Sequence, residues 1–168
     1  MRRKNKLKNI ILIGMPGSGK STVGVLLAKS AGMGFIDTDL LIQSTFNKFL
    51  YKMIEEDGIE AFIEAEGAAV SRLICDNCVI ATGGSVVYND RAMEHLKTLG
   101  DIVYINVPCD EIQKRLKNIR TRGVVMREGE TIRDLYKERA PLYEKYADVI
   151  VNGEADAEST VEKILEVI

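Results

Sequence analysis

The segment Gly14–Thr22 constrains the fold of this chain more than any other part of the sequence. It reads Gly-Met-Pro-Gly-Ser-Gly-Lys-Ser-Thr and directly follows the apolar run Ile10–Ile13, so it fits the pattern G-x-x-x-x-G-K-[ST] between a strand and a helix. Its three glycines permit backbone conformations that are closed to residues with a Cβ, so that successive N–H groups can point at phosphate oxygens. The segment therefore predicts a loop that binds the phosphates of a nucleotide.

Two polar side chains of this loop have predicted roles of their own. Lys20 supplies a positive charge for the outer phosphates, and the Ser21 hydroxyl is placed to complete the coordination of Mg²⁺. The helix that follows adds its positive N-terminal end. The expected nucleotide-binding residues of the loop are Gly14, Gly17, Ser18, Gly19, Lys20, Ser21 and Thr22.

Length and charge limit the classes of protein to which this chain can belong. Its 168 residues suffice for one well-buried core, so we expect a single domain over residues 1–168. A net charge of -2 does not favour a nucleic-acid partner, and no apolar run is long enough to span a membrane. We therefore expect a cytoplasmic monomer that acts on a small molecule. The pair Cys75 and Cys78 is interpreted as two small apolar residues, one closing a helix face and one opening a strand.

Short continuous apolar runs alternate with helical patterns along the chain. Continuous runs are typical of strands that are covered on both faces, and they occur at Ile10–Ile13, Phe35–Ile36, Val79–Ala81, Ile102–Val107 and Val149–Val151. The alternation predicts an α/β fold with a mainly parallel five-stranded sheet sandwiched by helices. Two segments interrupt it: a helical one at about 40–73, expected to form a substrate-binding flap, and an arginine- and glycine-rich one at about 118–129, expected to form a mobile lid.

Two aspartates, Asp37 and Asp39, follow the expected strand Phe35–Ile36. Their carboxylates should reach the edge of the sheet that carries the phosphate loop. One of them can bind Mg²⁺, and the other can hydrogen-bond an accepting hydroxyl and take its proton. The alternative is that Asp37 or Thr38 simply caps the next helix.

Two further features are ambiguous when taken alone. The turn Thr82–Ser85 contains paired glycines at the same sheet edge, which either allow a ligand to touch the backbone or simply form a tight turn. Arg139 lies in a helical segment, where a surface salt bridge is the ordinary expectation.

Taken together, these motifs resemble the shikimate kinase family in order, in spacing and over nearly the whole chain. The motifs that carry the resemblance are Gly14–Thr22, Asp37–Asp39, Thr82–Gly84, Arg120–Arg127 and Arg139–Tyr143. The resemblance implies a P-loop kinase of the nucleoside monophosphate kinase group. It also implies that ATP and Mg²⁺ are the cofactors and that the γ-phosphate is transferred to a ring hydroxyl.

The resemblance also implies roles for individual residues. Arg122 corresponds to the lid arginine that reaches the transferred phosphate, and Arg115 to the residue that stacks on adenine. The implied catalytic residues are Lys20, Asp39 and Arg122. The implied substrate-binding residues are Asp39, Gly83, Gly84 and Arg139, where Arg139 holds the substrate carboxylate. The implied metal ligands are Ser21 and Asp37.

The chain departs from the family pattern in the flap and next to it. The pattern G-E-x-x-F-R-x-x-E occurs here as Gly58–Glu66, with Ile63 in place of a carboxylate-binding arginine and Ile59 in place of the first acid. Ser85 replaces a third glycine, and the lid has Gly-Val-Val after Arg122 where Pro-Leu-Leu is typical. We therefore expect a working small-molecule kinase, and an acceptor other than shikimate remains open.

Several functions remain open. Shikimate is the leading single acceptor, since Arg72 is a second candidate for holding its carboxylate. A gluconate, sugar or other polyol kinase is the alternative within the enzyme class, and a non-catalytic module that senses ATP is the alternative outside it. A nucleoside monophosphate kinase is disfavoured because the flap from Thr38 to Glu66 carries no arginine for an acceptor phosphate.

Overall fold

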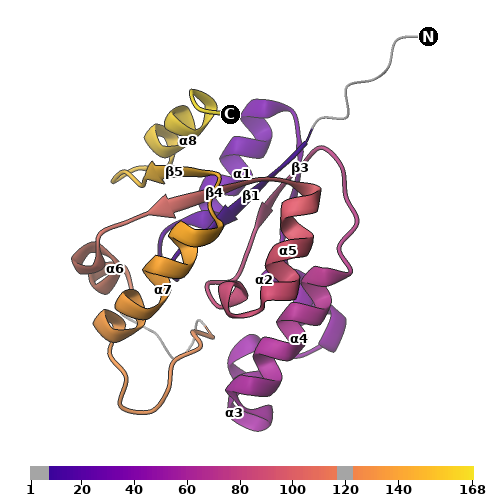
Figure 1. Cartoon of the computed structure of the whole chain (residues 1–168), viewed down its shortest axis with the longest axis vertical. Coiled ribbons are helices and arrows are strands. Elements are labelled where there is room, and N and C mark those ends of the chain that lie inside the picture. The colour runs from indigo at the N-terminus through magenta and orange to yellow at the C-terminus, as the bar shows by residue number, and fades with distance from the viewer. Residues whose placement is uncertain (1–7, 117–122) are drawn as a thin grey trace.

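Five parallel strands form the centre of the computed structural model, which describes residues 8–116 and 123–168 (Figure 1). The strand order is β2-β3-β1-β4-β5, and β1 lies in the middle, with Ile11 opposite Ile80 of β3 and Ile102 of β4. The strands are β1 (Asn9–Ile13), β2 (Gly34–Asp37), β3 (Cys78–Ala81), β4 (Gly100–Asn106) and β5 (Val149–Asn152). The predicted five-stranded sheet is confirmed, and every pair of neighbouring strands is parallel.

Helices cover both faces of this sheet, as the continuous apolar strands predict (Figure 1). One face carries α1 (Lys20–Ala31) and α8 (Ala157–Leu165), and the other carries α5 (Asp90–Leu99) and α7 (Ile132–Tyr146). Asn89 caps α5, and Thr131 forms a capping box with Asp134 at the start of α7. Two short elements, η1 (Val86–Tyr88) and α6 (Cys109–Arg115), complete this part of the chain.

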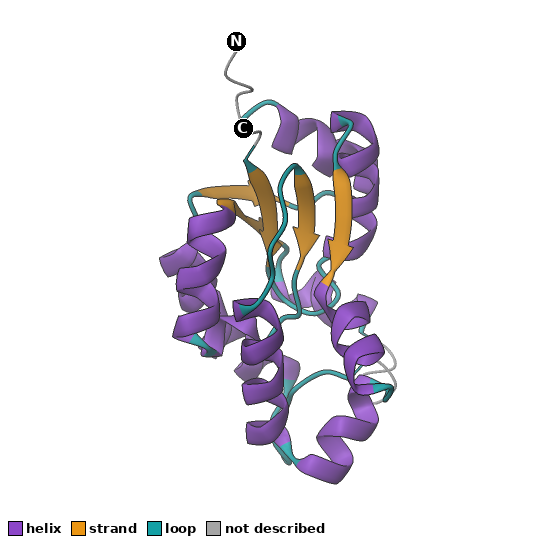
Figure 2. Ribbon diagram, turned by 90° about the vertical axis from the view of Figure 1, so that its right-hand side faces the viewer, coloured by secondary structure: helices purple, strands orange, loops and turns teal. Residues whose placement is uncertain are grey.

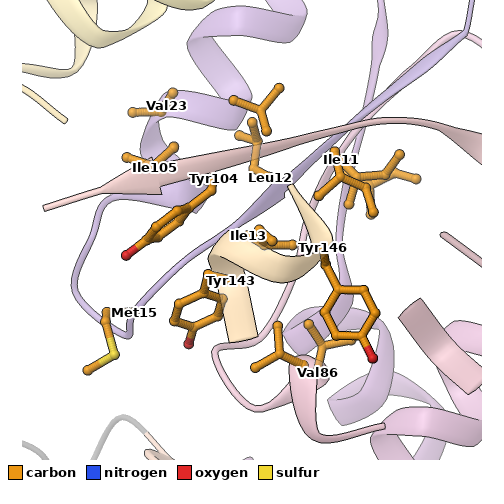
Figure 3. Close-up of a cluster of buried hydrophobic side chains, with 14 of the residues drawn as sticks. Ile11, Leu12, Ile13, Met15, Val23, Val86, Tyr104, Ile105, Tyr143 and Tyr146 are labelled. Atoms are coloured by element: carbon orange, nitrogen blue, oxygen red, sulfur yellow. The ribbon is translucent and has the colours of Figure 1, made fainter. Parts of the chain in front are cut away.

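The core lies between the sheet and these helices. Ile11, Leu12 and Ile13 of β1 are fully buried, and the rings of Tyr104 and Tyr143 stack with their centroids 5.2 Å apart (Figure 3). Tyr104 belongs to β4 and Tyr143 to α7, so this aromatic contact fixes α7 against the sheet.

Asn9 joins three parts of the chain at the amino end of the sheet. Its Nδ2 donates hydrogen bonds to the carbonyl oxygens of Cys75 and Leu99, and its Oδ1 accepts one from the backbone N–H of Cys78. These backbone groups precede or begin β3 and β4. The buried Asn9 amide therefore holds the starts of the two strands that flank β1.

Three helices extend beyond the carboxyl ends of the strands, where the arrowheads in Figure 2 point. They are α2 (Thr38–Phe46), α3 (Leu50–Asp57) and α4 (Ile59–Ser71), so the segment predicted at 40–73 is helical and begins two residues earlier than expected. They enclose a small core of their own, to which Val125 from the far end of the predicted lid contributes. This contact places residues 123–125 against the helical segment.

Two smaller predictions about this region differ from the structure. Cys75 lies in the loop between α4 and β3 and does not close a helix face, because α4 ends at Ser71, whereas Cys78 does begin β3. Arg72 is an exposed C-cap of α4 and lines neither of the two cavities at the sheet edge, so its proposed contact with an acceptor carboxylate is wrong. None of the helices in the described residues has the length and hydropathy needed to cross a membrane.

Candidate active site

The phosphate loop occupies the turn between β1 and α1 at the carboxyl edge of the sheet. Gly14, Gly17 and Gly19 all have positive φ angles, of 148°, 78° and 93°. A Cβ at Gly14 would also stand 2.7 Å from the carbonyl oxygen of Ile105. Both conformation and space therefore require glycine in this loop, as the motif predicts.

Lys20 is the first residue of α1 and folds back over the loop. Its Nζ donates hydrogen bonds to the carbonyl oxygens of Gly14 and Met15, each at 2.8 Å. Burial lowers the pKa of this ammonium group to about 8, although Asp39 and Asp37 nearby act in the opposite direction. Lys20 is thus a desolvated donor at the helix N-terminus, where phosphate oxygens are favoured.

Asp37 caps α2 and also contacts the phosphate loop. Its Oδ1 accepts hydrogen bonds from the backbone N–H groups of Asp39 and Leu40, which makes Asp37 the N-cap of α2. Its Oδ2 accepts a hydrogen bond of 2.6 Å from the Ser21 hydroxyl. One carboxylate and one hydroxyl therefore lie side by side next to the phosphate loop, and such hard oxygen donors suit Mg²⁺.

Asp39 lies two residues further along, in the first turn of α2 and at the wall of a cavity of about 320 Å³. Burial, and then the negative charge of Asp37, raises the pKa of its carboxyl group to about 6, while Lys20 opposes the rise. Lys20, Ser21 and Thr22 from the phosphate loop line the same cavity, together with Gly83, Gly84 and Arg139. The structure thus brings the predicted phosphate-binding and acceptor-binding side chains to one place.

Arg139 of α7 is only 1% exposed, so the salt bridge on the surface that it suggests by itself is wrong. Its Nε donates to the Tyr88 hydroxyl, and its Nη2 donates to the carbonyl oxygen of Val125. Its Nη1 has no hydrogen-bond partner among the described residues and lies about 3.2 Å from the point where a Cβ of Gly84 would stand. Arg139 is therefore a buried cation with one free donor beside the paired glycines.

Glu66 and Ser85 form a buried pair to which sequence reasoning gave no role. The Ser85 hydroxyl donates a hydrogen bond of 2.5 Å to Glu66 Oε2, and burial raises the pKa of the Glu66 carboxyl group to about 7. Within the part of the chain that the structure describes, Glu66 Oε1 has no partner. This oxygen and Asp39 Oδ1 lie 2.2 and 2.9 Å from the point where a Cβ of Gly83 would stand. The two acids consequently approach each other across Gly83.

Comparison with known proteins places this geometry in a family. The family model "Shikimate kinase" matches residues 16–168. The shikimate kinase of Clostridium botulinum (strain Alaska E43 / Type E3) is 36% identical to the chain, with 98% of each protein covered. This chain belongs to the shikimate kinase family. Threonine synthase-like 1 of Mus musculus is 37% identical over 96% of the chain, but the chain spans only 22% of that protein.

Solved structures of shikimate kinases have the same fold. The shikimate kinase from Acinetobacter baumannii, solved in complex with shikimate, superposes with a TM-score of 0.89 at 31% identity, covering 96% of this chain and 92% of that one. The shikimate kinase from Aquifex aeolicus superposes with a TM-score of 0.77 at 32% identity, covering 94% of each chain. The resemblance stated from the motifs is therefore confirmed for the family and for the fold.

The family resemblance also assigns roles to Arg122 and Arg115 and a departure from the pattern to Ile63. Arg122 lies outside the described residues. Arg115 lines a depression behind the phosphate loop, where its side chain donates to Glu111 and to the carbonyl oxygen of Glu154. Ile63 lies half-buried on α4 and lines a second cavity, which adjoins the first at Arg139 and Val125. Ile63, at the position of the missing family arginine, and Arg139 therefore line the same second cavity.

Proposed function

We propose that this chain catalyses the Mg²⁺-dependent transfer of the γ-phosphate of ATP to a hydroxyl group of a small metabolite. One observation carries the proposal: Lys20, Ser21 and Asp39 line a single cavity at the carboxyl edge of a parallel sheet. This is the edge at which α/β proteins bind their ligands. Membership of the shikimate kinase family supports the same reaction class.

In the proposed reaction each side chain has a separate task. Lys20 and the backbone N–H groups of the loop hold the phosphates, and a Mg²⁺ ion would supply further positive charge beside the transferring group. Ser21 and Asp37 would hold this ion. Asp39 hydrogen-bonds the acceptor hydroxyl and takes its proton as the oxygen attacks the γ-phosphorus. The bond from that phosphorus to the bridging oxygen breaks, and ADP leaves.

The raised pKa of Asp39 fits this role. A carboxyl group with a pKa of about 6 is ionised at pH 7, yet it is a stronger base than an ordinary aspartate. The acceptor reaction is therefore expected to lose rate as the pH falls below about 6, since protonated Asp39 cannot accept the proton.

Shikimate is the first single acceptor to test, because the family resemblance names it, and its carboxylate is the group whose binding Ile63 weakens. The free Nη1 of Arg139 supports binding of a carboxylate, because it is a buried donor beside Gly84. Ile63 stands where the family pattern has a second arginine, however, so this chain lacks that cation. A hydrogen bond between charged groups is worth about 1.5–3 kcal/mol. We expect shikimate to bind this chain roughly ten- to a hundredfold more weakly than a pocket with both arginines.

A sugar or other polyol without a carboxylate is the second candidate acceptor, and Ile63 is the observation that favours it. An apolar side chain at this position gives no compensation for desolvating an acid. It leaves the hydroxyl contacts at Asp39 unaffected.

The test measures ADP release with Mg²⁺-ATP and a panel of acceptors that contains shikimate, gluconate, sugars and cyclic polyols. The matched controls are Asp39→Asn, which keeps the shape of the side chain but cannot take a proton, and Asp76→Asn, which makes the same change in the loop before β3. The proposal predicts acceptor-dependent ADP release that falls by about a hundredfold or more in Asp39→Asn alone. ATP binding without turnover on any acceptor would instead indicate a module that senses ATP.

A further inference from the structure

An apolar cavity of about 270 Å³ adjoins the proposed active site. Five apolar side chains line it, from the start and middle of α4, from the segment before α7 and from α7 itself. They are Ile59, Ile63, Val125, Met126 and Leu135, and we name this cavity the apolar chamber.

The apolar chamber and the catalytic cavity share part of their walls. Arg139 and Val125 line both cavities and are joined by the hydrogen bond from Arg139 Nη2 to the Val125 carbonyl oxygen. A molecule that places a hydroxyl at Asp39 and reaches past Arg139 would enter the chamber next. The chamber is therefore positioned to take the far end of an acceptor.

The charges at its mouth select against an anion. Glu60 and Glu64 are exposed on α4, and Glu130 is half-buried opposite them. Among the described residues, the cations that line the chamber are Arg127, which already lies 3.9 Å from Glu138, and Arg139. Since the three acids outnumber these two cations, a negatively charged group in the chamber would meet repulsion as well as an apolar wall.

Arg139 itself does not turn the chamber into a polar site. Its guanidinium group is directed to Tyr88 and Val125 by two hydrogen bonds, and its free Nη1 lies on the side of Gly84, which lines the catalytic cavity and not the chamber. Ile59 and Ile63 are four residues apart on α4, so they share one face of that helix. Both contribute aliphatic carbon to the chamber at the two positions where the family pattern has charged residues.

We propose that the acceptor of this kinase carries a neutral apolar substituent of several heavy atoms, which binds in the apolar chamber. The inference rests on the proposed function, because the reacting hydroxyl must lie at Asp39. The chamber has room for such a group, since a volume of about 30 Å³ holds one water molecule in the liquid. Burying each methylene of the substituent should tighten binding about fourfold.

The experiment compares shikimate with its methyl, ethyl and propyl esters, which replace the carboxylate by a neutral group of increasing length. Dissociation constants are measured by calorimetry with Mg²⁺ and a non-hydrolysable ATP analogue, and ADP release is measured separately with ATP. We expect every ester to bind more tightly than shikimate, with a gain of about fourfold for each methylene.

Variants at Ile63 test the chamber directly. Ile63→Arg should reverse the order, so that shikimate binds best, and Ile63→Ala should reduce the gain per methylene because it removes part of the wall. Ile74→Arg is the matched control, since Ile74 is 92% exposed and lies outside the chamber. Its ligand preference should equal that of the unaltered protein. The Ile63→Ala result decides the matter if Ile63→Arg does not fold.

The experiment distinguishes a wrong proposal about the apolar chamber from a wrong proposed function. The chamber is wrong if affinity does not depend on ester length, or if shikimate binds better than all three esters to the unaltered protein. Phosphotransfer to shikimate or a polyol would still stand in that case. Conversely, longer esters could bind more tightly while no acceptor of the panel causes ADP release. That result would support the apolar chamber and refute the kinase function.

Discussion

Replacing Glu66 with glutamine is expected to stabilise the protein at neutral and alkaline pH. Glu66 is 1% exposed, and burial raises the pKa of its carboxyl group from 4.5 to about 7, even though the hydrogen bond from Ser85 favours the charged form. A raised carboxyl pKa means that the folded protein retains a proton that the unfolded chain has released. The free energy of unfolding therefore falls as the pH rises from about 4.5 to about 7, and the loss is complete above pH 7.

The size of this effect follows from the pKa. Since one pKa unit corresponds to about 1.4 kcal/mol, the ionised Glu66 carboxylate lowers stability by about 3 kcal/mol above pH 7. Glutamine has nearly the same shape and can still accept the hydrogen bond from Ser85, but it carries no charge to desolvate. The variant should gain up to about 3 kcal/mol over the unaltered protein at pH 8 and almost nothing at pH 4.5.

The assay is urea unfolding followed by far-ultraviolet circular dichroism at a series of pH values, because the chain contains no tryptophan. Glu64→Gln is the matched control: Glu64 is two residues earlier on α4 and exposed, so its curve should follow that of the unaltered protein. The difference in the free energy of unfolding between Glu66→Gln and the unaltered protein should grow from pH 4.5 to pH 8. If it is constant over this range, the burial of an ionisable carboxyl group is not the cause.

Three further predictions concern the sheet, the paired glycines and the phosphate loop. Asn9→Ala should lower the free energy of unfolding by about 2–3 kcal/mol in urea, because it removes the Asn9 hydrogen bonds to three part-buried backbone groups. Gly83→Ala should reduce acceptor kcat/KM about a hundredfold with little change in ATP affinity by calorimetry, because its Cβ would displace Glu66 and Asp39. Lys20→Met should weaken ATP binding roughly ten- to a hundredfold. It should also raise the free energy of unfolding at pH 7, since burial lowers the Lys20 pKa to about 8 and the penalty is full below that pH. Unchanged values in any of these measurements would contradict the corresponding contact.

The sequence predicted best those features that depend on local pattern. The phosphate loop is a contiguous segment whose glycines must adopt positive φ angles, so its position and its strand–helix setting could be predicted from composition and spacing alone. The strands could be predicted equally well, because strands that are covered on both faces have continuous apolar runs in the sequence. Asp37 was predicted as either a helix cap or a metal ligand; the structure confirms the cap through Oδ1, and Oδ2 accepts a hydrogen bond from Ser21, while the metal role stays a prediction.

Features that depend on packing between distant segments could not be predicted from the residues alone. Arg139 is an ordinary surface residue by local pattern, and only the packing of α7 against η1 and Val125 buries it. The pair of Glu66 and Ser85 joins residues that are 19 positions apart, and the only available signal was that both lie in family motifs. The apolar chamber likewise needs α4, α7 and the segment before α7 to meet.

The energetics of Lys20, Asp39 and Glu66 connect the fold to the proposed chemistry. Burial shifts the pKa of each group in the direction that favours its neutral form, which is downward for the lysine and upward for the two acids. A core selected for stability alone would replace such groups with apolar ones, since desolvated charges lower stability unless they are paired. Phosphate oxygens would restore the interactions that Lys20 has lost, and an acceptor hydroxyl would do so for Asp39. The three groups therefore make the folded chain less stable by itself and more responsive to ligands, which is the expected state of a site arranged for the transition state rather than for the empty protein.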